Sequence, residues 1–288
     1  MIPAIALSLL SAVLNAAWNA LLKVSGDPMV TATRAETAST IAATPLLAVT
    51  WLLAGRPALP VAGWGLAGAS AVFEFVYFLC LTTAYRRGEL SVVYPLARGS
   101  APLLAVAAGI LLLGEGMNVR TLIGVALLLA GILMVRRPSR AAWAVMWPAL
   151  LTGAAIAAYS AIDKEGTQQA PPWLYGWAMW TGTALLLLGW AGVVKKRNGP
   201  ASVTGSAEHA SAPPFRRAAL IGALMLTSYF MVLIALRLAP LVVVAPLRES
   251  GIVVVTAVSA WRLGERTGLR MRLAGSVSIL CGAVVLAT

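Results

Sequence analysis

Long apolar runs, separated by short polar links, recur from one end of the chain to the other. Each run is about 20 residues long, which is the length that a helix needs to cross the hydrocarbon core of a bilayer. The runs predict ten helices, at about 3–24, 31–54, 64–85, 90–114, 119–135, 142–162, 172–194, 215–236, 241–262 and 269–287. The pattern therefore predicts an all-α polytopic membrane protein with ten transmembrane helices.

The fourth and ninth predicted helices repeat one another. Val92-Val93 and Pro95-Leu96 recur as Val243-Val244 and Pro246-Leu247 at a shift of 151 residues. Leu-Gly-Glu closes both helices, at 113–115 and 263–265. The glycines of the fifth and tenth helices follow at the same shift, Gly124 and Gly131 matching Gly275 and Gly282. These matches predict two five-helix repeats, at 1–137 and 138–288. Because five is odd, the two repeats must be inverted across the membrane, as in many secondary transporters.

Composition agrees with the membrane class and narrows the function. Hydrophobic residues make up 60% of the chain and charged residues only 11%, less than half the share usual in a soluble domain. The net charge of +12 does not predict a nucleic-acid patch, because most basic residues sit in the short links between apolar runs. Cys80 and Cys281 both lie within apolar runs, where we interpret them as small buried hydrophobes.

The distribution of basic residues predicts the orientation. The links after the first, third, fifth, seventh and ninth helices share one side and hold sixteen of the 22 Lys and Arg residues, whereas the other side holds four. The side rich in Lys and Arg faces the cytoplasm. In a bacterial inner membrane, both termini would therefore face the periplasm.

Several of these features together resemble the drug/metabolite transporter superfamily, and specifically its ten-helix EamA-like members. They are the five-plus-five duplication, the tight link in AYRRGELSVVYPL, the two Leu-Gly-Glu ends and the glycine-rich fifth and tenth helices. The resemblance implies a basket of helices whose cavity is lined mainly by helices 1, 3, 4, 6, 8 and 9. It also implies secondary transport of amino acids, other small metabolites or drugs. Members are often described with cytoplasmic termini, and the count of basic residues here predicts the opposite.

Charged residues at membrane depth are candidates for a substrate site. Arg98 lies about nine residues into the fourth helix, and Arg248 with Glu249 lies at the equivalent depth of the ninth. The alternative is a structural ion pair, such as Arg98 with Glu74 or Arg248 with Glu249. Glu74, the acid in the middle of the third helix, is either a proton-coupling group or the counter-charge of Arg98.

Polar and aromatic donors surround these charges in the predicted arrangement. A polar stripe at helical spacing in the first helix ends in Asn15, Trp18 and Asn19 and should face protein or water. Tyrosines on other helices add phenol groups, namely Tyr77, Tyr94, Tyr159 and Tyr229. We interpret the set as pocket-lining, although interhelical hydrogen bonding explains any single member. Pro95 and Pro246 are candidate hinges, since each removes a hydrogen bond from its helix.

The sequence gives little support for a catalytic site or a metal site. His209, the sole histidine, lies in the polar loop 195–214, and neither GxSxG nor HExxH occurs. No cofactor or metal site is predicted. Glu115 and Glu265 are interpreted as surface residues beside Arg120 and Arg266.

The sequence thus predicts a secondary transporter that exports a small zwitterionic or anionic metabolite, such as an amino acid, by alternating access around a midplane cavity. Its partners would be the small-molecule substrate, the lipid bilayer and, as a candidate coupling ion, protons. The first alternative is an exporter of drugs or other cationic compounds that uses Glu74. An intramembrane enzyme or a scaffold without transport activity is the alternative from another class. A scaffold has no need for charges buried at mid-span.

Overall fold

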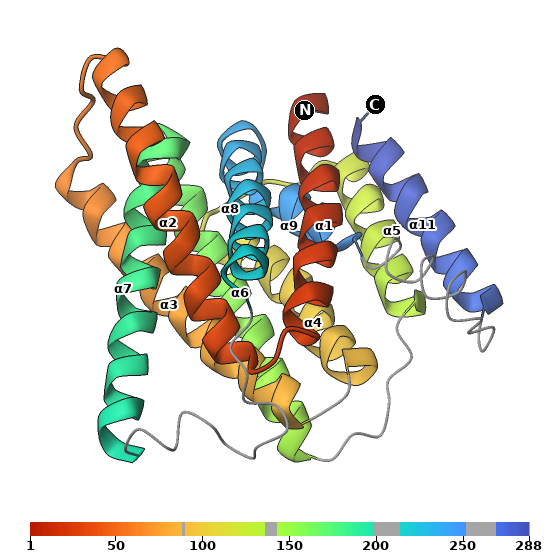
Figure 1. The fold of residues 1–288 in the computed structure, drawn as a ribbon. Helices are drawn as coiled ribbons and strands as arrows, with labels where there is room; N and C mark the ends of the chain where they lie inside the picture. Colours follow the sequence, from red (N-terminus) through yellow and green to blue (C-terminus); the bar gives the residue numbers. More distant parts are fainter. Residues whose placement is uncertain (88–89, 136–142, 199–213, 252–268, 288) are drawn as a thin grey trace.

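The computed structural model describes residues 1–87, 90–135, 143–198, 214–251 and 269–287, which contain ten helices and no strand. Most of the helices run roughly side by side (Figure 1). Their bounds are α1 Ile2–Lys23, α2 Pro28–Leu53, α3 Val61–Arg87, α4 Leu90–Leu111, α5 Val119–Val135, α6 Trp143–Gln169, α7 Pro172–Asn198, α8 Phe215–Leu238, α9 Leu241–Glu249 and α11 Leu269–Ala287. The predicted helical class is confirmed.

Local sequence signals explain where individual helices begin and end. Asp27 caps α2, its side chain accepting hydrogen bonds from the backbone N–H groups of Met29 at 2.9 Å and Val30 at 3.0 Å. Pro28 follows at the first helical position, where a missing N–H costs nothing. The helix α9 is shorter than the predicted 241–262, since it gives way to a turn at 250–251. The remainder of that prediction, from 252 onward, lies outside the described residues.

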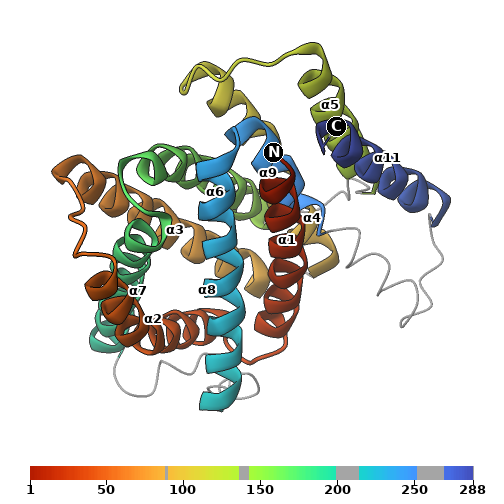
Figure 2. The ribbon, with the colours of Figure 1, turned by 90° about the horizontal axis from the view of Figure 1, so that it is seen from above.

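Helices from the two halves of the chain interleave. Helix α1 packs on α8, α3 packs on α6, and α2 packs on both α7 and α8. Helix α4 packs on α6 and α9, and α3 also contacts α7. Seen from above, these helices surround a central region, and α5 with α11 forms a separate pair beside it (Figure 2). The core of the molecule therefore lies where first-half and second-half helices meet.

Glycines allow two of these contacts to be exceptionally close. A Cβ atom built on Gly222 of α8 would lie 2.2 Å from the carbonyl oxygen of Ala35 in α2. One built on Gly131 of α5 would lie 2.5 Å from the carbonyl oxygen of Gly275 in α11. Small residues let helix backbones approach in this way in membrane proteins.

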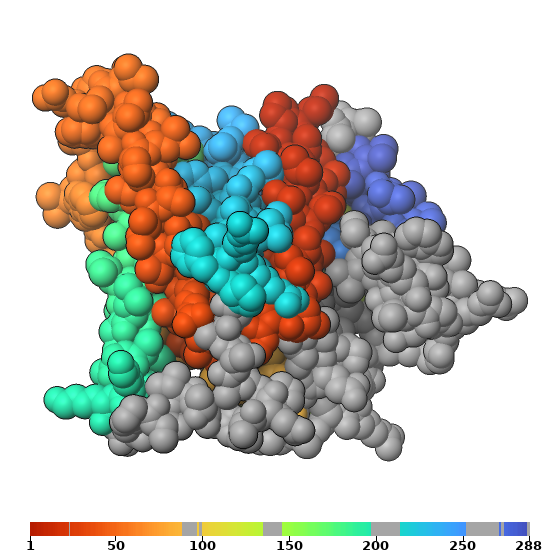
Figure 3. Space-filling model, in the orientation of Figure 1, coloured from red at the N-terminus to blue at the C-terminus, as the bar shows by residue number. Residues whose placement is uncertain are grey.

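The outer surface is apolar, and much of the polar chemistry is inside. On α2, the exposed side chains include Ile41, Leu46 and Leu53, and α1, α2 and α8 present one continuous face (Figure 3). Glu36, Glu74, Asp163 and Arg248 are all buried. Within the described residues, four helices, α1, α3, α7 and α8, are long and apolar enough to cross a membrane. An apolar exterior around buried charges is the arrangement expected in a bilayer.

Polar contacts tie neighbouring links together at each end of the bundle. At one end, Arg86 at the end of α3 forms an ion pair with Asp27, 2.5 Å between Nη2 and Oδ2. At the other end, where α1 begins and α11 ends (Figure 1), the carboxylate of Glu115 accepts the backbone N–H groups of Leu241 at 2.7 Å and Val242 at 2.9 Å. Glu115 thus caps α9 rather than lying simply at the surface beside Arg120. Glu265 lies outside the described residues.

Candidate functional site

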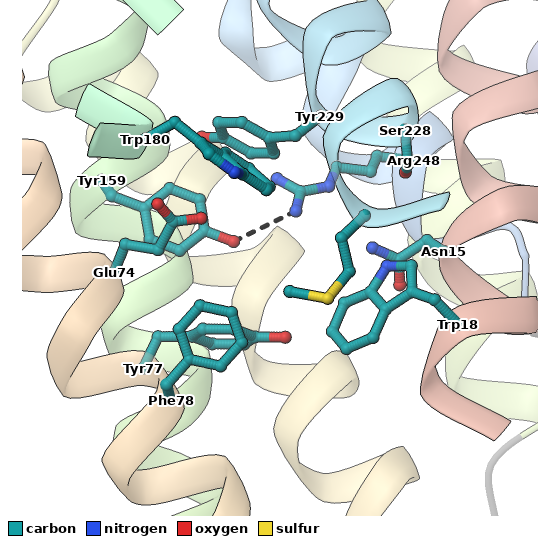
Figure 4. A pocket seen from close by; sticks show the side chains of 11 residues that line it. Asn15, Trp18, Glu74, Tyr77, Phe78, Tyr159, Trp180, Ser228, Tyr229 and Arg248 are labelled. Atoms are coloured by element: carbon teal, nitrogen blue, oxygen red, sulfur yellow. Dashed lines mark hydrogen bonds between the residues drawn. The ribbon is translucent and has the colours of Figure 1, made fainter. Parts of the chain in front are cut away.

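A small cavity lies where the interleaved helices meet. Its lining residues come from α1, α3, α6, α7, α8 and α9, and Figure 4 shows their side chains converging on one space. They are Asn15, Trp18, Glu74, Tyr77, Phe78, Tyr159, Trp180, Met225, Ser228, Tyr229 and Arg248. Both halves of the chain contribute, as expected for a site between repeats.

Arg248 is the central positive charge of this cavity. It lies near the end of α9, two residues after Pro246, and only 6% of its surface is exposed. Its Nη2 donates a hydrogen bond to the hydroxyl of Tyr159 at 3.0 Å. The guanidinium carbon lies 5.7 Å from the ring centroid of Tyr159 and 5.1 Å from that of Tyr229. Cation–π contacts of this kind stabilise a buried positive charge.

Glu74 supplies a carboxyl group to the same cavity. It is 4% exposed and enters from α3, and its Oε2 accepts a hydrogen bond from Thr183 Oγ1 of α7 at 2.9 Å. Figure 4 shows Glu74 and Tyr159 on one side, Trp18 and Asn15 on the other, and the guanidinium of Arg248 between them. A cation site and an anion site are thereby held in one small space.

Aromatic rings form much of the remaining wall. Tyr77 and Tyr159 meet edge to face with centroids 5.9 Å apart, as do Tyr159 and Tyr229 at 5.7 Å. Trp180 of α7 lies 5.9 Å from Tyr229, and Trp18 closes the side of α1. Such a wall suits an apolar or aromatic group attached to a charged one.

A second layer of hydrogen bonds fixes these walls. Asp163 of α6 is fully buried and accepts hydrogen bonds from the hydroxyls of Tyr175, at 2.7 Å, and Tyr229. On α1, Asn19 donates to the side-chain oxygen of Asn15 at 3.0 Å and accepts from the hydroxyl of Tyr85 at 3.0 Å. The orientation of Tyr229 and Asn15 is therefore set by residues that do not themselves line the cavity.

Seven of the residues selected from the sequence line the cavity, namely Asn15, Trp18, Glu74, Tyr77, Tyr159, Tyr229 and Arg248. Asn19 supports Asn15 instead. Glu249 and Pro246 are buried in α9 but are not among the lining residues. The backbone of α4 includes Tyr94, Pro95 and Arg98, but the side chains of these three lie outside the described part of the chain.

Sequence reasoning missed several residues of the site. Phe78, Trp180, Met225 and Ser228 also line the cavity, and nothing in the apolar pattern separates their positions from ordinary packing positions. Asp163 carried a usable signal, because it follows Tyr159 by four residues and so shares its helix face. The helix α6 continues past the predicted end at 162 to Gln169, so Asp163 lies within it.

Comparisons with known proteins agree with this architecture. Residues 2–137, the first predicted repeat, match the model of the EamA-like transporter family. Twenty-eight chains of solved structures match the chain. One of them, a crystal structure, shares 15% sequence identity with a TM-score of 0.72, over 98% of this chain and 97% of its own; at that identity the likeness shows the fold alone. A search of curated proteins found no match. The match over residues 2–137 supports membership of the chain in the drug/metabolite transporter superfamily, and the EamA-like family to which it points implies a membrane transporter of that type.

Proposed function

We propose that this transporter exports a small zwitterionic or anionic metabolite, such as an amino acid, by alternating access around the central cavity. The observation that carries the proposal is Arg248, which lies buried in the cavity wall against two tyrosine rings. A guanidinium is the preferred protein partner for a carboxylate, which it binds with two parallel hydrogen bonds.

The other lining residues support a substrate with three parts. Arg248 receives a carboxylate, and Glu74 across the cavity receives an ammonium group. The sequence alone suggested Glu249 for the ammonium, but Glu74 is the acid that lines the cavity. The aromatic wall accepts an apolar or aromatic side chain.

The helix packing supports two inverted repeats, 1–137 and 138–288, that rock around the cavity. The proposed repeats pair α1 with α6, α2 with α7, α3 with α8 and α4 with α9. The contact between α1 and α8 then has its counterpart in the contact between α6 and α3. By the same correspondence α2–α8 matches α7–α3, and α4–α6 matches α9–α1. All six contacts are present. Reciprocal contacts are what a two-fold axis requires, and inverted repeats that rock about a shared site are a common design for alternating access.

The remaining predicted site residues keep their proposed roles. Arg98 and Tyr94 of α4 correspond in depth to Arg248 and its neighbours on α9, so we propose that they join the site from the first repeat. Pro95 and Pro246 are proposed hinges, because each proline leaves its helix one hydrogen bond short.

Three probes that differ only in their charged groups test the assignment. L-phenylalanine carries both groups, 3-phenylpropionate only the carboxylate, and 2-phenylethylamine only the ammonium. Arg248→Lys should weaken the affinity for the first two by about tenfold or more, about 1.4 kcal/mol, and leave the amine unaffected. Glu74→Gln should weaken the first and third and leave the acid unaffected. Binding to purified protein and counterflow in proteoliposomes provide the measurements, and Arg98→Lys is tested in the same way.

A second candidate is the export of cationic compounds. It is favoured by Glu74 standing beside aromatic rings that include Trp18 and Trp180, a combination that attracts organic cations. Under this alternative the amine would bind at least as well as the amino acid, and Arg248→Lys would not reduce affinity for any probe. That result would reject the carboxylate site.

A further inference from the structure

Glu36 of α2 is a buried carboxyl that the transport site does not use. Glu36 is 0% exposed, and neither Oε1 nor Oε2 has a hydrogen-bond partner among the described residues. It lies beside the closest contact of α2 with α8, since its neighbour Ala35 presents a carbonyl oxygen to Gly222. The carboxyl is therefore enclosed by packed helices rather than by solvent.

The position of Glu36 connects it to the cavity. Three residues further along α2, Ser39 accepts a hydrogen bond at 3.1 Å from the indole N–H of Trp180, which lines the cavity. Glu36 also interacts electrostatically with Glu74, the acid inside the cavity. Glu36 thus belongs to the layer directly behind the cavity wall.

The burial of the Glu36 carboxyl, without hydrogen-bond partners among the described residues, favours its neutral form. An ionised carboxylate that loses water and gains no hydrogen bond or counter-charge costs many kcal/mol, whereas a neutral carboxylic acid costs far less. We propose that Glu36 holds a proton in this conformation and that this proton is exchanged for the ammonium group of a substrate bound at Glu74. The second part of the proposal rests on the proposed function.

The surrounding charges give the exchange its direction. Of these groups, Glu74 of α3 interacts with Glu36. Among the described residues, Glu74 in turn interacts with Asp163 of α6, Tyr175 of α7, Tyr229 of α8 and Arg248 of α9, and Tyr159 of α6 lines the same cavity. From α1, the neutral Asn15 and Trp18 line the cavity. An ionised Glu74 opposes a second negative charge on Glu36. An ammonium group at Glu74 cancels that repulsion, so substrate binding makes the proton of Glu36 easier to release.

Thermodynamic reciprocity makes proton and substrate compete. If the substrate favours loss of the proton, then the proton weakens binding of the substrate by the same factor. A transporter that binds one or the other moves protons inward as substrate moves outward. The proposal therefore supplies a driving force for export.

Infrared spectroscopy tests the proton on Glu36 without any ligand. The carbonyl stretch of a neutral carboxylic acid is distinct from that of a carboxylate, and at neutral pH it should be present in the wild type and lost in Glu36→Gln. Glu165→Gln is the matched control, because Glu165 is exposed at the end of α6, and it should keep the band. An unchanged band in Glu36→Gln would overturn the proposal, as would a failure of this isosteric variant to fold while the control folds.

Proton release tests the exchange. In weakly buffered detergent solution, binding of L-phenylalanine should release protons from the wild type and from Glu165→Gln, whereas 3-phenylpropionate should release none. Glu36→Gln should still bind L-phenylalanine, measured by tryptophan fluorescence, without releasing protons. Equal release from Glu36→Gln would place the proton elsewhere. If the wild type binds none of the probes, the proposed function fails and the exchange fails with it, while the infrared band still decides whether Glu36 holds a proton.

Discussion

Asp163 joins two tyrosines in the interior of the bundle. It accepts hydrogen bonds from Tyr175 and Tyr229, and the ring of Tyr229 lies 5.1 Å from the guanidinium carbon of Arg248. The carboxylate therefore sets the position of Arg248 through an intermediate ring, without being among the residues that line the cavity. We regard Asp163 as a positioning residue for the proposed carboxylate site.

Replacing Asp163 by asparagine should weaken binding of L-phenylalanine. The amide keeps one oxygen acceptor but presents N–H donors where Asp163 accepts a phenol hydroxyl. Loss of one such hydrogen bond is worth about 1 kcal/mol, or roughly fivefold in affinity. Dissociation constants for Asp163→Asn, Tyr229→Phe and the double variant provide the measurement. Because the two residues act as a unit, the double variant should lose little more than either single variant; strictly additive losses would contradict the mechanism.

For single residues, the sequence predicted the cavity lining correctly where a charged residue lies inside an apolar run. Glu74 and Arg248 stand out because a charge inside an apolar run needs a reason, and both line the cavity. Phe78 and Trp180 carry no such contradiction, since aromatic residues are ordinary in any membrane helix. Their role depends on which way each helix face turns, and that is decided by tertiary packing.

Among the helices, α9 has the most unusual beginning. Both oxygens of Glu115, from the link after α4, accept backbone N–H groups at its first turn. Nearby, Lys164 of α6 donates to the carbonyl oxygens of Leu236 at 2.7 Å and Ala239 at 3.0 Å. The contacts of Glu115 join the two halves of the chain at the end of the bundle where α1 begins, and those of Lys164 hold α6 to the end of α8 and the link before α9.

Glu115→Gln should reduce thermal stability more than Glu165→Gln does. Glutamine has one acceptor oxygen in place of two and no negative charge for the positive end of the helix dipole. Loss of a capping interaction costs about 1 kcal/mol. Melting temperatures of the two variants in the same detergent provide the comparison, since both remove one acid. Equal melting temperatures would show that the cap contributes nothing to stability.

Helix bounds followed from sequence where apolar runs end at clear polar signals. Both α5 and α11 match their predicted ranges, 119–135 and 269–287. The prediction for α6 stopped at 162, but the helix continues to Gln169 because its last turns are polar rather than apolar and still helical. Hydrophobicity reports where a helix leaves lipid, and hydrogen bonding decides where it ends.

For the whole molecule, orientation in the membrane is the main untested prediction. The start of α1 and the end of α11 lie at one end of the bundle (Figure 1), and the Asp27–Arg86 pair lies at the other. Most Lys and Arg residues belong to links at this second end. We expect the first end to face the periplasm.

Reporter fusions check this orientation. Alkaline phosphatase fused after Thr288 should be active, and a fluorescent protein at the same point should be dark. The matched control places the same reporters in the loop 199–213, on the side rich in Lys and Arg, where the results should reverse. A fluorescent, phosphatase-negative fusion at Thr288 would show that charge bias does not set the orientation of this chain.

The glycine contacts between α5 and α11 constrain how such a molecule can move. Gly131 meets the carbonyl oxygen of Gly275, and Gly124 and Gly282 approach each other's backbone in the same way. Sliding either helix by about one turn would press a bulky side chain, such as that of Leu128 or Ile279, into a gap sized for a hydrogen atom. The pair α5–α11 therefore resists sliding along its length, and we expect the two helices to move relative to each other by pivoting at these glycine contacts. The halves would then change their tilt while their separation at this seam stays constant, and the surrounding lipids would experience a rotation with little change in the area of the protein.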